Sequence, residues 1–261
     1  MKLDFAIRVA ALTAAAAIAS GAAAQTPGPE AKPDYTLTGN FGLYSQYIFR
    51  GLTQTNRKPA VQGGFDFAHA SGFYAGTWAS NVSWLNDAGL VDDGQSLEWD
   101  FYGGYRHAFN DDFGFDAGIL YYWYPGDYLP GVTKPNTTEL YIAGSWKWVS
   151  LKYSHSVDDT FGIPNSRNSW YLDLSANYPL TDALTLNAHV GRQEYKGSNG
   201  GVNNGDALDY TDWKIGVTWA LAGGWNLGAY YTDTNAKDAG YTLAGRNIGK
   251  ATGTVFVQKT F

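Results

Sequence analysis

The sequence contains no cysteine, so no disulfide framework holds the 261 residues together. Acidic residues outnumber basic ones by 24 to 18, and without a basic excess nothing favours nucleic-acid binding. His69, His107 and His189 stand alone, and no spacing indicates a metal site. After residue 24 no apolar run is long enough for a transmembrane helix, and no helical periodicity appears. We therefore expect no nucleic-acid partner, no metal and no cofactor.

The N-terminal segment MKLDFAIRVAALTAAAAIASGAAAQ has the parts of a secretory signal peptide. Lys2 and Arg8 precede an apolar run, and Ala22-Ala23-Ala24 offers an A-x-A cleavage site. The apolar run is too short to span a bilayer as a retained anchor. The expected organisation is a signal peptide at 1–24, a proline-rich lead at 25–34 and one domain at 35–261.

Aromatic residues make up 16% of the chain, and many of them alternate with polar residues. The stretch DYTDWKIGVTWAL at 209–221 is the clearest example. Successive side chains of a β-strand point to opposite faces, so two tryptophans, an isoleucine and a valine oppose Asp212 and Lys214. The pattern recurs along the chain, clearly at 97–106, 113–123 and 170–178, and with more noise elsewhere, as near 35–49. It predicts about twelve strands, mostly of about 8–14 residues, which suits tilted strands that cross a membrane.

The connections between these strands alternate between long and short. The first, FRGLTQTNRK, is long, and the short ones include ASG at 70–72, LTDA at 180–183 and AGG at 222–224. This alternation is typical of outer-membrane barrels, which have tight periplasmic turns and longer external loops. A closed barrel also leaves no unpaired strand edge in hydrocarbon. We therefore predict an all-β fold, a transmembrane antiparallel up-and-down β-barrel, with its apolar face against the lipid and lipopolysaccharide of the outer membrane of a Gram-negative bacterium.

Several stretches resemble the TorF-type porin family (the Gcw_chp domain) of proteobacterial outer membranes. They lie at 43–82, 97–107, 139–156 and 170–180, and the Arg50-Gly51 segment running into Gln62-Gly63-Gly64 is the most specific part. The resemblance covers essentially the whole mature chain and implies an outer-membrane β-barrel of the porin class. The final Phe261 ends an alternating strand, which resembles the signal recognised by the barrel-assembly machinery.

The polar face of the predicted strands carries seven acids and five bases. These pore-lining candidates are Arg50, Asp66, Glu98, Asp100, Arg106, Asp116, Glu139, Lys147, Lys152, Asp173, Asp212 and Lys214. One interpretation is a pore whose wall charges select ions or small polar solutes. The other is a set of mutually paired residues that close a narrow barrel, because about twelve strands give a lumen between those of small plugged barrels and wide porins. The excess of acids predicts a weak preference for cations.

An outer-membrane hydrolase is a rival from another class, raised by YSHSVDD at 153–159. In outer-membrane phospholipases the histidine and serine stand two residues apart, on one strand face. Here Ser154 and Ser156 flank His155 directly and point to the opposite face, although a nucleophile must lie within hydrogen-bond reach of its base. We therefore expect no enzyme. The predicted function is passive diffusion of small hydrophilic solutes or ions, and the alternative is a non-conducting structural or adhesive barrel.

Overall fold

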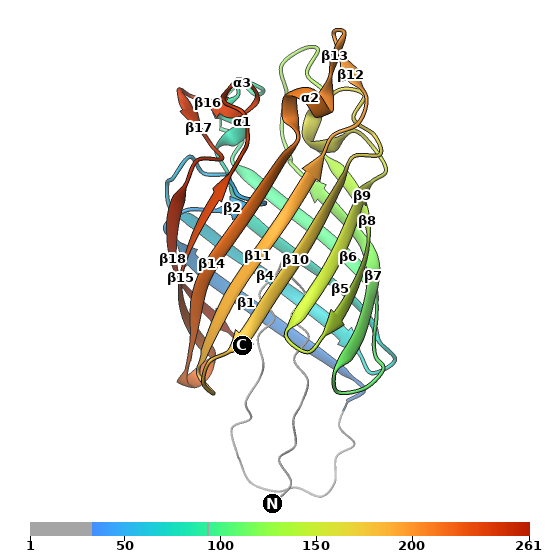
Figure 1. Ribbon diagram of the computed structural model, residues 1–261, viewed down its shortest axis with the longest axis vertical. Helices are drawn as coiled ribbons and strands as arrows, with labels where there is room; N and C mark the ends of the chain where they lie inside the picture. The colour runs from blue at the N-terminus through green and yellow to red at the C-terminus, as the bar shows by residue number, and fades with distance from the viewer. Residues whose placement is uncertain (1–32, 93) are drawn as a thin grey trace, which may run out of the picture.

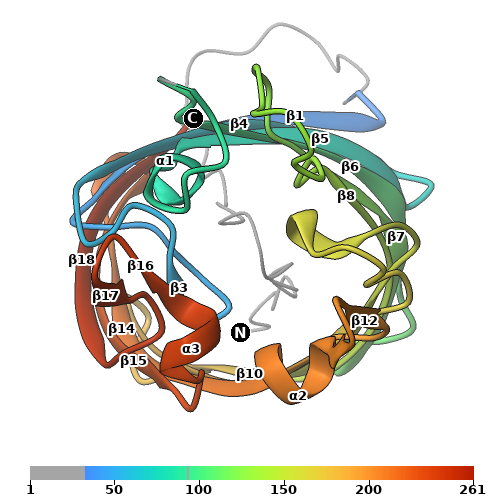
Figure 2. The same ribbon diagram turned by 90° about the horizontal axis from the view of Figure 1, so that it is seen from above.

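The structure is a computed structural model and describes residues 33–92 and 94–261. Twelve strands close into one antiparallel barrel in which each strand pairs with its neighbours in the chain and the last pairs with the first (Figures 1 and 2). They are β1 (Tyr35–Tyr44), β4 (Ala60–His69), β5 (Phe73–Asn81), β6 (Leu97–Ala108), β7 (Phe113–Trp123), β8 (Thr137–Trp146), β9 (Val149–Ser156), β10 (Trp170–Pro179), β11 (Leu184–Glu194), β14 (Tyr210–Leu221), β15 (Trp225–Thr234) and β18 (Thr252–Thr260). The predicted fold is confirmed. The predicted signal peptide at 1–24 lies outside the described residues.

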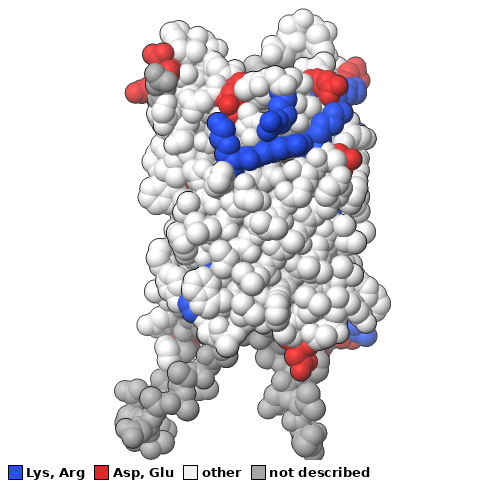
Figure 3. All heavy atoms as spheres, turned by 90° about the vertical axis from the view of Figure 1, so that its left-hand side faces the viewer, with Lys and Arg blue, Asp and Glu red and all other residues white. Residues whose placement is uncertain are grey.

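The outer surface of the barrel is apolar, as the alternation predicts. On β14, Ile215 is 49% and Trp219 54% exposed, whereas Asp212 on the opposite face is fully buried. The same parity leaves large apolar side chains exposed on the other strands, among them Leu37, Phe65 and Leu140. Figure 3 shows a wide band almost free of charge between charged residues near the two ends. A surface of this kind suits hydrocarbon, with polar residues kept inside.

The two ends of the barrel differ, as the loop lengths predict. The short turns lie at one end, and the long loops gather at the other end (Figure 1). The long loops carry the hairpins β2–β3 (Ile48–Phe49 and Leu52–Thr53), β12–β13 (Ser198–Asn199 and Val202–Asn203) and β16–β17 (Thr242–Leu243 and Arg246–Asn247). They also carry the short helices α1 (Trp84–Asp87), η1 (Thr160–Gly162), α2 (Asn204–Leu208) and α3 (Asp238–Tyr241), and η2 (Ala222–Gly224) forms one short turn. In the described chain, no helix combines the length and the apolar character needed to cross a membrane.

The buried apolar residues lie inside the barrel, beneath the long loops. One cluster consists of Tyr47, Ala60, Trp78, Val82, Leu85, Val91, Leu120, Tyr122 and Tyr124. A second consists of Leu52, Tyr210, Ala236, Tyr241 and Ile248. Both clusters join loop residues to inward-facing strand residues. The core therefore fixes the long loops against the inner wall, and Figure 2 shows these loops reaching inward over that end of the barrel.

Candidate functional site

The first long loop folds into the barrel, where the alternation near 35–49 predicted a continuing strand. Strand β1 ends at Tyr44, and the hairpin β2–β3 follows with its tip at Arg50 and Gly51. Both tip residues have positive φ, 46° and 78°, as a two-residue turn of the tightest hairpins requires. A Cβ on Gly51 would lie 2.6 Å from Cβ of Asp212 on β14. Gly51 therefore lies against β14, three strands from β1 in the barrel order, and only glycine fits there.

Arg50 links this tip to two strands of the wall. Its guanidinium donates to Glu139 Oε2 on β8 at 2.7 Å and to Gln193 Oε1 on β11 at 3.0 Å. Its Cζ lies 4.3 Å from the ring centroid of Tyr171. The side chains of Arg50 and Glu139 are only 7% and 1% exposed, so this is a desolvated ion pair. Burial alone would lower the pKa of Arg50, but the Glu139 carboxylate outweighs it and holds the pKa above its ordinary value.

Tyrosines donate hydrogen bonds to several carboxylates of the inner wall. Glu98 accepts hydrogen bonds from Tyr47 at 2.6 Å and Tyr124 at 2.8 Å, and it is 1% exposed. Asp66 accepts from Tyr102 and Asp116 from Tyr74, both at 2.6 Å. These carboxylates are therefore held in place by tyrosine hydroxyls, which leave their negative charge unchanged.

His189 on β11 is not isolated, contrary to the sequence-based expectation. Its ring nitrogens lie 2.5 Å from Asp173 Oδ2 and 2.7 Å from Asp212 Oδ1. The remaining oxygens of these carboxylates accept hydrogen bonds from Ser175 and Tyr171. Strand parity could have revealed the group, because all its members share the inner face, but the register between strands was needed to bring them together. Within the residues that the structure describes, no set of His, Asp and Glu is arranged to hold a metal ion.

A cavity of about 340 Å³ lies in the lumen beside the hairpin tip. Its lining includes Arg50, Asp100, Lys152, Asp173 and Lys214 from the predicted set, together with amide and hydroxyl side chains such as Asn177, Asn187, Thr218 and Gln258. Lys152 Nζ lies 4.0 Å from the ring centroid of Tyr141, and Lys214 Nζ lies 5.3 Å from that of Tyr230. The cavity therefore has a polar wall that carries charges of both signs.

Seven of the twelve predicted residues do not line this cavity, and Lys147 and Arg106 are two of them. Lys147 sits in a short turn with φ 53°, and its half-exposed ammonium lies 3.8 Å from Asp112 in the neighbouring turn. It does not line the lumen, because the chain reverses direction there and the alternation of faces ends. Arg106 packs near the same end of the barrel interior, with Cζ 4.8 Å from the ring centroid of Tyr74.

The residue expected to direct assembly lies on the outer surface, and the residues weighed for catalysis lie on opposite faces of one strand. Phe261 pairs through its backbone with Gly39 and leaves its side chain 66% exposed. The buried Ser154 and Ser156 face inward, whereas His155 faces outward, with Nε2 3.3 Å from Asn168 Oδ1. The histidine and the serines are thus on opposite faces of β9.

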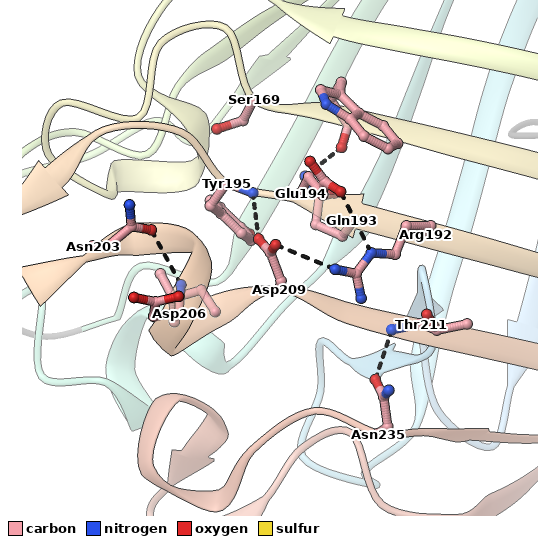
Figure 4. A network of polar contacts seen from close by, with 12 residues as sticks. Ser169, Arg192, Gln193, Glu194, Tyr195, Asn203, Asp206, Asp209, Thr211 and Asn235 are labelled. Carbon is pink, nitrogen blue, oxygen red and sulfur yellow. Dashed lines mark hydrogen bonds and ion pairs between the residues drawn. The ribbon is translucent and has the colours of Figure 1, made fainter.

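A polar network anchors the long loop between β11 and β14 (Figure 4). Asp209 accepts hydrogen bonds from the backbone N–H of Tyr195 at 2.7 Å and from Arg192 Nη2 at 3.3 Å. Burial raises the pKa of the Asp209 carboxyl, and the Tyr195 hydrogen bond offsets part of that rise. Asn203 caps α2 by accepting from the backbone N–H of Asp206 at 3.2 Å. The loop is therefore held to the rim of the barrel.

The sequence profile of a family described as "Bacterial protein of unknown function (Gcw_chp)" matches residues 28–261. No curated protein matches the chain. Among solved structures, the KdgM porin is similar with a TM-score of 0.54 at 11% identity, covering 86% of this chain and 99% of that one. The NanC porin gives 0.53 at 10% identity, covering 86% and 98%. The COG4313 outer membrane channel from Pseudomonas putida F1 gives 0.52 at 14% identity, covering 91% and 100%. At these identities the likeness shows a shared barrel fold.

Proposed function

The chain belongs to the Gcw_chp family, and from its barrel we propose that it is a porin-like channel through which small hydrophilic solutes or ions diffuse passively across the outer membrane. The observation that carries this proposal is the polar cavity of about 340 Å³ inside a barrel whose outer face is apolar. Charged and amide side chains that line a membrane-spanning lumen favour the passage of polar solutes. The similar solved structures are porins and channels, which agrees with a protein that transports and does not catalyse.

The hairpin β2–β3 sets the width of the proposed path. Its tip crosses the lumen from β1 to β8 and β11 through Arg50, and Gly51 lies against β14. Because these contacts hold the hairpin at its tip, we expect it to narrow the proposed passage by a constant amount. We expect this passage to admit small solutes and to exclude large ones.

The alternative is a non-conducting structural or adhesive barrel. The two buried clusters that fill the long-loop end favour this alternative, since they narrow the lumen there. The polar cavity beside the hairpin favours conduction, because a plugged barrel has no need of a hollow lined by charged and amide side chains. No contact of His155 favours hydrolysis.

The cellular setting follows from the same proposal. We expect the segment at 1–24 to direct export and the barrel-assembly machinery to insert the protein by recognising Phe261. We also expect the barrel to contact lipid and lipopolysaccharide. Membership of the TorF-type porins is part of the same proposal, supported by the Arg50-Gly51 segment that forms the hairpin tip.

Swelling of liposomes that contain the refolded protein tests the proposal. Neutral sugars of increasing size are offered, and each preparation is first checked for slower migration on gels after boiling, which shows that the barrel was folded. We expect swelling with small sugars and none with large oligosaccharides. Folded protein that admits no sugar of any size would contradict the proposed function.

A further inference from the structure

Four exposed basic residues gather on the outer rim of the barrel, in the loops that lead into β4 and β18. Arg57 and Lys58 lie just before β4, and Arg246 and Lys250 lie in the loop before β18. Both strands pair with β1, so the two loops are neighbours. Figure 3 shows basic side chains in a nearly continuous row above the uncharged band, at the end that carries the long loops. We call these four residues the basic rim.

Hydrogen bonds bring the two loops of the basic rim together. Arg57 Nη2 donates to the carbonyl oxygens of Lys250 at 3.2 Å and of Ala251 at 3.1 Å. Arg246 Nη1 donates to the carbonyl oxygen of Asn56, the residue before Arg57, at 3.2 Å. A guanidinium has five N–H donors, and within the described chain each of these two arginines uses only one nitrogen in its bonds. Most of the donors of both arginines therefore remain available to a ligand.

The basic rim carries more positive charge than its surroundings neutralise. Among the residues that the structure describes, Arg57, Lys58 and Arg246 make no ion pair. Lys250 Nζ lies 3.4 Å from Asp238 Oδ1, and both side chains are largely exposed. By strand register Asp233 at the end of β15 is the next acid along the rim. Four bases thus stand against two acids, and the excess charge is positive.

The surface below the basic rim is apolar and faces lipid. Leu43 on β1 lies opposite Val61 on β4 and Val257 on β18, and the side chains of Leu43 and Val61 are about half exposed. Lys58 stands three residues before Val61, so at most about 11 Å of chain separates the two. The positive charge therefore lies at the edge of the apolar band. Basic clusters beside a membrane-spanning surface attract anionic lipid headgroups.

We propose that the basic rim binds the phosphate groups of a lipid A molecule, the lipid anchor of lipopolysaccharide, whose acyl chains lie along β1, β4 and β18. This inference rests on the proposed placement of the barrel in the outer membrane with its long loops outside, and it assigns the contact with lipopolysaccharide to one site. Lipid A carries phosphates on its sugars and several acyl chains, which matches the order of basic rim and apolar band. The arginines suit phosphate because a guanidinium donates two parallel hydrogen bonds to its oxygens.

Titration of the detergent-refolded protein with lipid A, followed by native mass spectrometry, tests the site. Bisphosphorylated lipid A is compared with enzymatically dephosphorylated lipid A, which has the same acyl chains. We expect the phosphorylated form to bind about tenfold more tightly or better, and the difference to shrink at high salt. Arg57→Gln combined with Arg246→Gln should weaken its binding about tenfold or more, the usual effect of losing a charge-assisted hydrogen bond.

The matched control is Lys134→Gln combined with Arg167→Gln. These substitutions also remove two exposed positive charges from long loops, but from the β7–β8 and β9–β10 loops, and should leave lipid A binding unchanged. Because Arg57 and Arg246 also join two loops, Lys58→Glu tests charge alone. Its side chain makes no hydrogen bond to the described residues, and reversing its charge should weaken binding of bisphosphorylated lipid A severalfold. Migration on unheated gels checks that each variant is folded.

Equal binding of the two forms of lipid A, or unchanged binding by either the double arginine variant or Lys58→Glu, would overturn the proposal. Displacement of lipid A by an equal concentration of soluble glucosamine 1-phosphate would also overturn it, because the site would then take free sugar phosphates. Binding in detergent requires no conduction, so lipid A binding without liposome swelling would contradict only the proposed conduction. Swelling with sugars but no binding of lipid A would contradict only this site.

Discussion

The Arg50–Glu139 pair offers a direct test of how the hairpin β2–β3 is held. Glu139→Gln removes the negative partner of a guanidinium that is 7% exposed and leaves that charge buried. Breaking a buried pair on one side typically costs about 3–5 kcal/mol. If the hairpin tip moves into water, Arg50 is hydrated again. The decrease in the free energy of unfolding is then limited to the cost of releasing the hairpin. We expect Glu139→Gln to lower the free energy of unfolding by a few kcal/mol, and by about 3 kcal/mol at most if the hairpin tip is released.

Two assays report on this variant. Urea unfolding in lipid vesicles, followed by tryptophan fluorescence, measures the free energy of unfolding. Single-channel recordings measure current noise, which should increase as the freed hairpin moves. The control is Asp112→Asn, which removes a half-exposed partner 3.8 Å from Lys147 and should cost about 0–1 kcal/mol.

A second variant tests the cause. Arg50→Met combined with Glu139→Leu replaces the pair with apolar side chains of similar size, and such exchanges are often neutral or stabilising. Stability close to that of the wild type in this double variant would show that the buried charge causes the loss. The reasoning is refuted if Glu139→Gln is no more destabilising than Asp112→Asn and its current is equally quiet.

Two further predictions follow from the orientation of side chains and from the hairpin turn. Val217→Arg places a charge on the lipid face and should destabilise the protein by roughly 2–4 kcal/mol at mid-membrane, whereas Thr218→Arg on the inner face should be tolerated far better. The two variants are compared by their folding yields in vesicles. Equal yields would contradict the assignment of faces. Gly51→Ala adds a Cβ at φ 78° against Asp212 and should destabilise by about 1–3 kcal/mol, as judged by urea unfolding. The control is Gly144→Ala, where a Cβ has open space, and a similar loss in both variants would show that the tip is not tightly packed.

The barrel could be predicted from the sequence because the two faces of a strand are assigned from the residues of that strand alone. Alternation of side chains assigns Trp213 and Ile215 to one face and Asp212 to the other without any knowledge of neighbouring strands. Loop lengths likewise separate the two ends. The orientation of each strand and the closed topology therefore follow from single segments of the chain.

The contents of the lumen could not be predicted in the same way. That Arg50 crosses to β8 depends on the inward path of the first loop, and the grouping of His189 with Asp173 depends on strand register. Counting charges also cannot show which groups are engaged inside the lumen: Glu98 accepts hydrogen bonds from two tyrosines, and Lys152 lies over the ring of Tyr141. Lys147 was assigned to the lumen by extending the alternation into a turn, where it no longer applies.

The central claim is that the barrel conducts through a lumen narrowed by the hairpin β2–β3. The most direct measurement compares single-channel conductance in planar bilayers between the wild type and a variant in which residues 48–53 are replaced by two glycines. The account predicts discrete small steps for the wild type and larger steps for the shortened variant. Folded protein that shows no steps in either form, or steps of the same size in both, would contradict it.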